Sequence, residues 1–207
     1  MAYFTIDEVR RAAASVTGAA LDDHLISIRA DAFFERQSAE ARMVPVRHFD
    51  IFLSHAYKDK VIVAGIYQLL KASGFTVYVD WVHDRSRIDR SKVTADNAAI
   101  LRERMRQCSA LFFVTTDNYK DSRWMPWECG YFDGYDGKMI SGRIQAGHVA
   151  ILPVLESPTE TFKGVEYLGL YPVDQKGNLT RRNINIHNQK IPSRSIHFDP
   201  WVKNGHP

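Results

Sequence analysis

The chain has 207 residues, of which 45% are hydrophobic and 25% charged, and its formal net charge is +3. These proportions are typical of a soluble globular protein whose core is large enough to support one domain. The net charge is too small to indicate nucleic acid or a membrane surface as a partner, so we expect neither.

The two cysteines, Cys108 and Cys129, have neither a zinc-ligand spacing nor a disulfide framework. We therefore expect no metal and a reducing compartment. The first residues, MAYFTIDEVRR, include acids and lack the apolar stretch of a signal peptide. No run approaches the roughly 18 apolar residues of a membrane span. These features predict a cytoplasmic protein.

Residues 1–45 are predicted to form a helical arm, because alanine and charged residues dominate the segment and it holds no strand-like run. Thr5 and Glu8 have the spacing of a capping box at a helix start. A second helix is predicted over about 21–41, where apolar residues form an imperfect helical stripe. We expect this arm to pack on the rest of its own chain rather than on a partner.

From His48 onward, short apolar runs alternate with helical stretches. The predicted strands are Phe49–Leu53, Phe75–Val79, Ala110–Thr115, His148–Val154 and a weaker fifth within Tyr167–Val173. The predicted helices run from a cap at Asp59 to a stop at Gly74, over about 95–107, and from about Trp124. Continuous apolar strands alternating with helices are typical of a parallel sheet covered on both faces. We expect an α/β domain over 46–175 and a C-terminal extension, 176–207, that packs on it or is irregular.

Ligands of such sheets bind beyond the carboxyl ends of the strands, where the strand order reverses. This rule directs attention to the segment after Leu155 and to the loops 54–59, 80–92 and 116–124. The second of these loops holds a basic cluster of Arg85, Arg87, Arg90 and Lys92. The cluster has two interpretations, a solvated loop or a patch that meets an anionic ligand such as a pyrophosphate.

The segment DSRWMPWEC, residues 121–129, holds the strongest candidate for chemistry. It follows the third predicted strand and opens a helix, with Pro126 suited to the first helical turn. Glu128 then falls in the first two turns, where the helix N-terminus favours an ionised carboxylate. A carboxylate beside the aromatic wall of Trp124 suits an electron-deficient sugar cation. The alternatives are a capping glutamate, which position 125, a Met, disfavours, and tryptophans that only fill the core.

Three further candidates follow the first two strands. Ser54 and His55 end the first strand, and adjacent strand residues point in opposite directions, so they are not a nucleophilic dyad. Ser54 is interpreted as a turn residue that offers a hydroxyl or a backbone donor to a ligand, and His55 as a surface residue or a ligand contact. Trp81, after the second strand, either stacks on a flat base or covers a hydrophobic edge.

The sequences FDIFLSH (49–55), GFTVYVD (74–80) and SRWMPWE (122–128) resemble, in order and spacing, the three boxes of Toll/interleukin-1 receptor (TIR) domains. The resemblance covers about residues 48–172. It implies a flavodoxin-like, three-layer fold with a five-stranded parallel sheet. The loop 80–92 departs from the family pattern, because it lacks the usual glycine and is unusually charged, so its assembly and substrate contacts are not carried over.

Enzymatic TIR domains cleave the nicotinamide–ribose bond of NAD, which is their substrate rather than a cofactor. By the resemblance, Glu128 holds the ribose hydroxyls and stabilises an oxocarbenium-like transition state, as glycosidase carboxylates do. Trp124 walls the site, and further residues line the pocket, namely Phe52, Ser54, His55 and Trp81.

The chain further resembles the stand-alone TIR subunits of bacterial anti-phage systems such as Thoeris, which make from NAD a nucleotide signal for a separate effector. The alternative is a non-catalytic adaptor that acts through TIR–TIR assembly into a homo-oligomer, although an adaptor needs neither Glu128 nor Trp124. A phospho-receiver is disfavoured, because Ser54 and His55 stand where it needs paired acids. A nucleoside deoxyribosyltransferase also uses a glutamate. The sequence leaves the product open among hydrolysed, cyclised and transferred ADP-ribose.

Overall fold

The computed structural model describes residues 3–89, 91–140, 143–145, 147–160, 162, 166–176, 182–191 and 193–204. The helices are α1 Ile6–Thr17, α2 Asp23–Met43, α3 Lys60–Ala72, α4 Asp80–His83, α5 Ala95–Arg106, α6 Met125–Asp136 and α7 Phe198–Asn204, with 3-10 turns at Tyr119–Asp121 and Glu166–Leu170. The strands are β1 Phe4–Thr5, β2 Phe49–Ser54, β3 Val77–Tyr78, β4 Cys108–Thr115, β5 Lys138–Ile140, β6 Arg143–Gln145, β7 Val149–Leu155, β8 Val173–Lys176, β9 Ile184–His187 and β10 Ser195–His197. Within these described ranges, no helix combines the length and the apolar character needed to cross a membrane.

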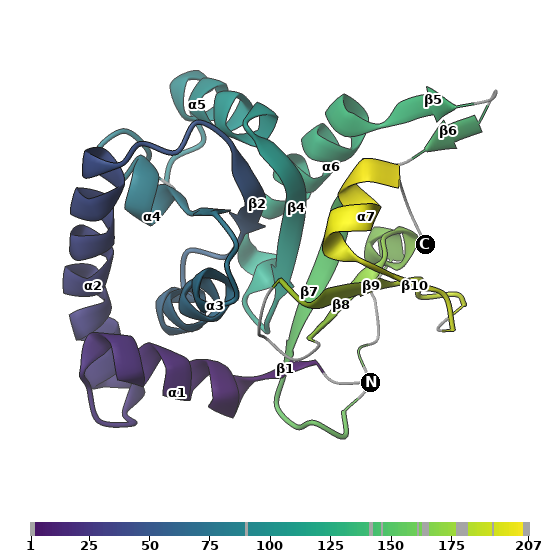
Figure 1. The fold of residues 1–207 in the computed structure, drawn as a ribbon. Coiled ribbons are helices and arrows are strands. Elements are labelled where there is room, and N and C mark those ends of the chain that lie inside the picture. The colour runs from purple at the N-terminus through teal and green to yellow at the C-terminus, as the bar shows by residue number, and fades with distance from the viewer. Residues whose placement is uncertain are drawn as a thin grey trace.

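Five parallel strands in the order β3-β2-β4-β7-β8 form the centre of an eight-stranded sheet, and Figure 1 labels the last four of them. This is the flavodoxin-like order, so the predicted fold class is confirmed. The order reverses at β2, because β3 joins one side of β2 and β4 joins the other. The carboxyl ends of β2 and β4 therefore mark the place where a ligand site is expected.

Two helical layers cover the sheet, and this explains the continuous apolar runs of its strands. Along β4, Phe112 and Val114 face a core cluster shared with α1, α2, α3 and α7. The alternate residues Leu111 and Phe113 face a second cluster shared with α5 and α6. Both faces of β4 are buried, so no position on it needs a polar side chain.

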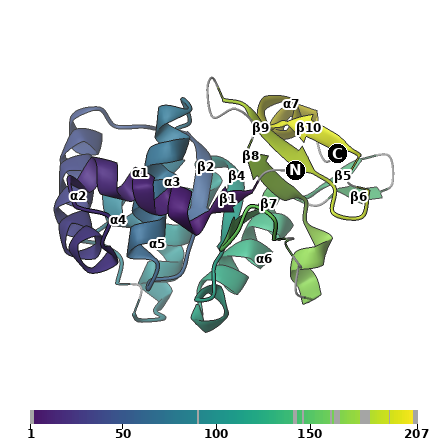
Figure 2. The same cartoon turned by 90° about the horizontal axis from the view of Figure 1, so that it is seen from below.

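The N-terminal arm packs on its own chain, and Figure 2 shows α1 crossing α3. The expectation that it holds no strand is wrong, because Phe4 and Thr5 pair in parallel with Val154 and Leu155 of β7. Thr5 also caps α1, its Oγ1 accepting a hydrogen bond of 3.3 Å from the backbone N–H of Glu8. The arm thus begins as part of the sheet before it continues as helices.

The fifth strand was predicted too early. Residues 166–170 form a 3-10 turn that buries Leu168, and β8 begins at Val173. Pro172 explains the boundary, because it has no N–H to donate and only its carbonyl joins the sheet, accepting from Ile151. Past β8, the described part of the extension adds antiparallel β9 and β10 and the helix α7, which buries Phe198 and Trp201.

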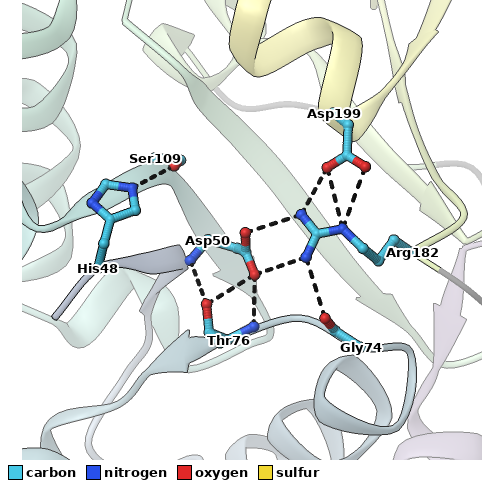
Figure 3. Close-up of polar contacts among 7 residues, drawn as sticks. All are labelled: His48, Asp50, Gly74, Thr76, Ser109, Arg182 and Asp199. Atoms are coloured by element: carbon cyan, nitrogen blue, oxygen red, sulfur yellow. Dashed lines mark hydrogen bonds and ion pairs between the residues drawn. The ribbon is translucent and has the colours of Figure 1, made fainter. Parts of the chain in front are cut away.

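Arg182 ties this extension to the start of the sheet (Figure 3). Its guanidinium donates two hydrogen bonds of 2.9 Å to the carboxylate of Asp50 and one of 2.7 Å to Asp199 at the start of α7. Thr76 donates to the same Asp50 carboxylate from its N–H and from its hydroxyl, both over 2.8 Å. The edge between β2 and β3 is therefore joined to the C-terminal extension through one partly buried arginine–carboxylate contact.

Candidate functional site

Glu128 and Ser54 meet at the carboxyl edge of the sheet. Ser54 is the last residue of β2, and its hydroxyl donates a hydrogen bond of 2.6 Å to Oε2 of Glu128, in the first turn of α6. Neither residue has any solvent-exposed surface. The two residues come from the segments on which the predicted site depends, and they lie where the strand order reverses.

The start of α6 places this carboxylate. Pro126 lies in the first turn, as predicted, and the hydroxyl of Ser122 accepts a hydrogen bond of 3.3 Å from the N–H of Met125. The side chain that accepts a hydrogen bond at the start of the helix is therefore Ser122, three residues before Met125. The N–H of Glu128 donates to the carbonyl of Trp124 over 2.8 Å, so the backbone of Glu128 is already part of the helix.

Trp124 and Phe52 form the apolar wall on the same face of β2 as Ser54. Phe52 precedes Ser54 by two residues and stacks on Tyr78, with 5.0 Å between ring centroids. Trp124 is 4% exposed and lies 5.4 Å from Trp127. Both belong to the cluster beneath α5 and α6, so the structure brings two more of the predicted residues to this face.

His55 and Trp81 form a separate group. His55 is buried, so its interpretation as a surface residue is wrong. Its Nδ1 lies 2.8 Å from the carbonyl oxygen of Leu53, and its Nε2 lies 3.4 Å from Oδ1 of buried Asp80. The Trp81 ring packs 4.6 Å from His55 and 5.4 Å from Phe34 of α2, covering a hydrophobic edge.

The group around Trp81 also lines a cavity of about 300 Å³ that includes Tyr57, Lys60 and Arg85. The segment 80–92, expected as a polar loop, begins with the short helix α4 instead. Beyond it, Ile88 packs partly buried on the cluster that holds Trp124. The carboxylate of Glu128 is closed to solvent in this conformation.

Asp59 has a role that was not predicted. Its side chain does not cap α3. Instead its carboxylate accepts hydrogen bonds from the hydroxyl of Thr116, over 2.6 Å, and from the amide of Asn118, over 2.5 Å. These bonds join the loops that follow β2 and β4, the two loops nearest the reversal of strand order. The sequence signal was three polar side chains in two loops already expected to meet.

The two cysteines lack the properties of nucleophiles. Burial raises the pKa of Cys129 to about 12, and burial also raises the pKa of Cys108 well above its ordinary value. A neutral thiol is a poor nucleophile, so neither cysteine is poised to attack a substrate. In the described parts of the chain, no three His, Cys, Asp or Glu side chains come together as they would to hold a metal ion.

The fold and the site together define a class of protein. Residues 51–180 match the family model of the TIR domain, and the chain belongs to that family. The resemblance seen in the three sequence boxes is thereby confirmed.

Two proteins similar in sequence to this chain are named as enzymes of one kind. The chain is 43% identical over 159 residues to "Probable 3' cyclic ADP-D-ribose synthase ThsB'" of Bacillus cereus (strain MSX-D12), which covers 75% of this chain and 76% of the relative. It is 31% identical over 83 residues to "Putative cyclic ADP-D-ribose synthase TIR2" of Cytobacillus dafuensis, which covers 40% of this chain and 22% of that relative.

Proposed function

We propose that this protein is a TIR enzyme that cleaves the nicotinamide–ribose bond of NAD, with Glu128 as its catalytic carboxylate. The observation that carries the proposal is the buried hydrogen bond between Ser54 and Glu128 at the reversal of strand order. A non-catalytic adaptor has no need of a carboxylate held in this way. The names of both relatives, as cyclic ADP-D-ribose synthases, support the same class of reaction.

The carboxylate acts on developing charge. As the bond between nicotinamide and the ribose carbon breaks, its electron pair leaves with nicotinamide and positive charge spreads over the ribose ring. A carboxylate held in a low-dielectric site stabilises that charge more strongly than water does. The Ser54 hydroxyl holds Oε2 of Glu128 and so fixes the orientation of the carboxylate relative to β2. Trp124 and Phe52 provide apolar surface for the leaving group.

We propose a cyclised ADP-ribose as the product. A second group of the same molecule attacks the ribose carbon and releases a proton, so NAD yields nicotinamide, the cyclic nucleotide and one proton. Hydrolysis needs water at the same carbon instead. Glu128 and Ser54 are fully buried, and a site that closes again over its substrate in this way disfavours water as the attacking group. Because Glu128 is closed to solvent, NAD reaches it only after the chain around it opens locally.

The deciding experiment follows NAD by chromatography and identifies the product by mass spectrometry. Glu128→Gln keeps the shape of the side chain and removes its charge, so we expect nicotinamide release to fall by at least about 100-fold. The matched control is Glu103→Gln, the same change at an exposed position of α5, with activity retained. Equal turnover by wild type and Glu128→Gln would overturn the catalytic assignment. Free ADP-ribose as the main product would overturn cyclisation alone.

The proposed activity also involves an effector and other copies of this chain. The cyclic nucleotide is proposed to act on a separate effector, as in anti-phage signalling, and TIR–TIR contact between copies is proposed to activate the enzyme. Both cysteines are free thiols, which supports a reducing compartment such as the cytoplasm as the place of reaction. Absence of turnover at every protein concentration, together with retained self-assembly, would favour the adaptor.

A further inference from the structure

A second cavity, of about 720 Å³, lies between the N-terminal arm and the domain. Its walls come from the C-terminal half of α2, from the 45–46 linker, from α4 with the two residues beyond Asp84, and from α5. Figure 1 shows α4 lying between α2 and β2, with α5 at the same end of the molecule. Neither Glu128 nor Ser54 lines this cavity, so it is separate from the candidate active site. Its volume falls in the range of small-molecule sites, about 300–1,000 Å³.

The floor of this cavity is apolar and partly aromatic. Phe49 and Val82 are 2% and 1% exposed, and the ring of His83 packs edge-on against Phe49 with 4.7 Å between centroids. Burial lowers the pKa of His83, so the imidazole is neutral at physiological pH and the floor carries no charge there. An apolar, partly aromatic floor of this kind is suited to the ring of a base.

The rim, in contrast, is basic. Arg42, Arg85 and Arg104 line it, and Glu35 is the acid among the lining residues. Arg104 donates two hydrogen bonds to buried Asp84 and is thereby fixed. Arg42, in the described structure, contacts the hydroxyl of Ser38 over 3.2 Å and has no carboxylate partner.

Arg85 is held on α2, where its guanidinium donates a hydrogen bond of 3.0 Å to the backbone carbonyl of Asp31. It lies 3.5 Å from Asp31 and 3.7 Å from Glu35 of α2, and its side chain is 37% exposed. The carboxylates of this region are also shared with other cations, Asp31 with Lys60 and Asp84 with Arg87. Among the residues that line the cavity, three arginines stand against one carboxylate, that of Glu35, so the lining itself carries more positive than negative charge.

We propose that this cavity binds a mononucleotide, with the base on the floor formed by Phe49 and Val82 and the phosphate between Arg42 and Arg85. Guanidinium groups bind phosphate by paired, charge-assisted hydrogen bonds, and they do so with geometric specificity. An aromatic ring joined to a dianion is the ligand chemistry that matches an apolar floor beneath a basic rim. Of the basic cluster in segment 80–92, Arg85 lines this cavity, Arg87 and Lys92 do not, and Arg90 lies outside the described residues.

Occupancy of the cavity would also act on residues 84–88. Arg85 joins the arm to residues 84–88, and a phosphate competes with Asp31 and Glu35 for its donors. Ile88 at the end of that stretch packs on the cluster holding Trp124. A nucleotide in the cavity therefore acts on a stretch of chain that packs on the apolar cluster beside the candidate active site.

The test is isothermal titration of the full chain with AMP, adenosine and inorganic phosphate. Glu128→Gln is the background, so that turnover does not enter the result. We expect saturable 1:1 binding of AMP and weaker binding of adenosine and of phosphate alone. Arg42→Ala should weaken AMP binding about tenfold or more, because it removes a charge-assisted hydrogen bond. Arg85→Ala should act in the same direction.

Arg11→Ala is the matched control, since Arg11 is exposed on α1, far from the rim in sequence and absent from the cavity lining. It makes the same change of net charge and should leave AMP affinity unchanged. Arg42 is exposed near the end of α2, so its removal should leave the fold intact, which a thermal melt of each variant verifies. Equal affinity in Arg42→Ala and Arg11→Ala, or absence of saturable AMP binding, would overturn the proposal and leave the assignment of Glu128 untouched.

Discussion

Ser54 and Glu128 are 74 residues apart in the chain, yet the hydroxyl of one lies 2.6 Å from a carboxylate oxygen of the other, in a contact fully shielded from solvent. A buried carboxylate requires donors, and Ser54 supplies one from the end of β2. The contact joins two of the three sequence boxes that mark the TIR family.

Ser54→Ala should lower the kcat for nicotinamide release by about tenfold or more, the usual size of a hydrogen bond to a charged group. The loss should fall on kcat rather than KM, because the hydroxyl is already engaged in orienting the carboxylate of Glu128. Steady-state kinetics against Ser109→Ala, a serine at the start of β4 that bonds to His48, provides the comparison. A kcat equal to that of wild type would refute a positioning role for Ser54.

Arg182→Met should make stability depend differently on pH. Burial by itself raises the pKa of Asp50, but hydrogen bonds from Arg182 and Thr76 and the guanidinium charge outweigh it and hold that pKa below its usual value. The resulting stabilisation is present above about pH 4 and is lost as the pH falls through the folded-state pKa.

We therefore expect Arg182→Met to lower the free energy of unfolding by about 1–3 kcal/mol at neutral pH, with the gap to wild type narrowing below about pH 4. Urea denaturation at several pH values measures both effects. Lys203→Met, on exposed α7 surface, removes one positive charge without touching Asp50 and serves as the control. A gap that stays constant down to about pH 3 would contradict the role given to Asp50.

Asp174→Asn should stabilise the protein. Asp174 is 1% exposed, and within the described residues neither of its carboxyl oxygens has a hydrogen-bond partner. Burial raises the pKa of Asp174 well above its usual value, so the folded state keeps a proton that the unfolded state releases near pH 4. Wild-type stability consequently declines as the pH rises from about 4 towards the folded-state pKa.

The asparagine cannot ionise, so the variant should be at least about 1 kcal/mol more stable than wild type at about pH 7–8 and similar to it near pH 4. Thermal and urea melts at the two pH values check this. Asp117→Asn, at an exposed position beyond β4, should show no such pH-dependent gain. If Asp174→Asn were less stable than wild type at the higher pH, the folded state would favour the ionised carboxylate and the expected cost of its burial would be refuted.

Gly65→Ala should loosen the arm. A Cβ at Gly65 on α3 would lie 2.1 Å from the carbonyl oxygen of Val9 on α1, so the two helices must separate. Overpacking of this kind costs about 1–3 kcal/mol, measured as a lower free energy of unfolding. At Gly134, on α6, a Cβ meets nothing within 4 Å, and Gly134→Ala should be neutral or slightly stabilising. Equal stability of the two variants would show that α1 does not rest on α3.

The predicted strands at 49–53 and 110–115 were close to β2 and β4, because strands buried on both faces are continuous apolar runs. Strands were predicted less well where the local sequence does not favour a strand and only pairing with a distant strand creates one. Phe4 and Thr5 are two residues at a helix start, and only the neighbouring edge of β7 makes them a strand. The segment Ile184–His187 alternates isoleucine with polar residues inside a tail rich in Asn, Arg and His, and it is a strand because β8 offers it a partner.

The sequence alone determined the alternation of strands and helices and the three boxes that identify a TIR domain, because hydrophobic periodicity and turn residues are local properties. It also placed Glu128 at a helix start. Only the tertiary structure decided that Ser54 donates to Glu128, that His55 is buried against Asp80, and that the arm and α4 enclose a cavity with a basic rim. These contacts join residues far apart in the chain, and their formation depends on how the helices pack on the sheet.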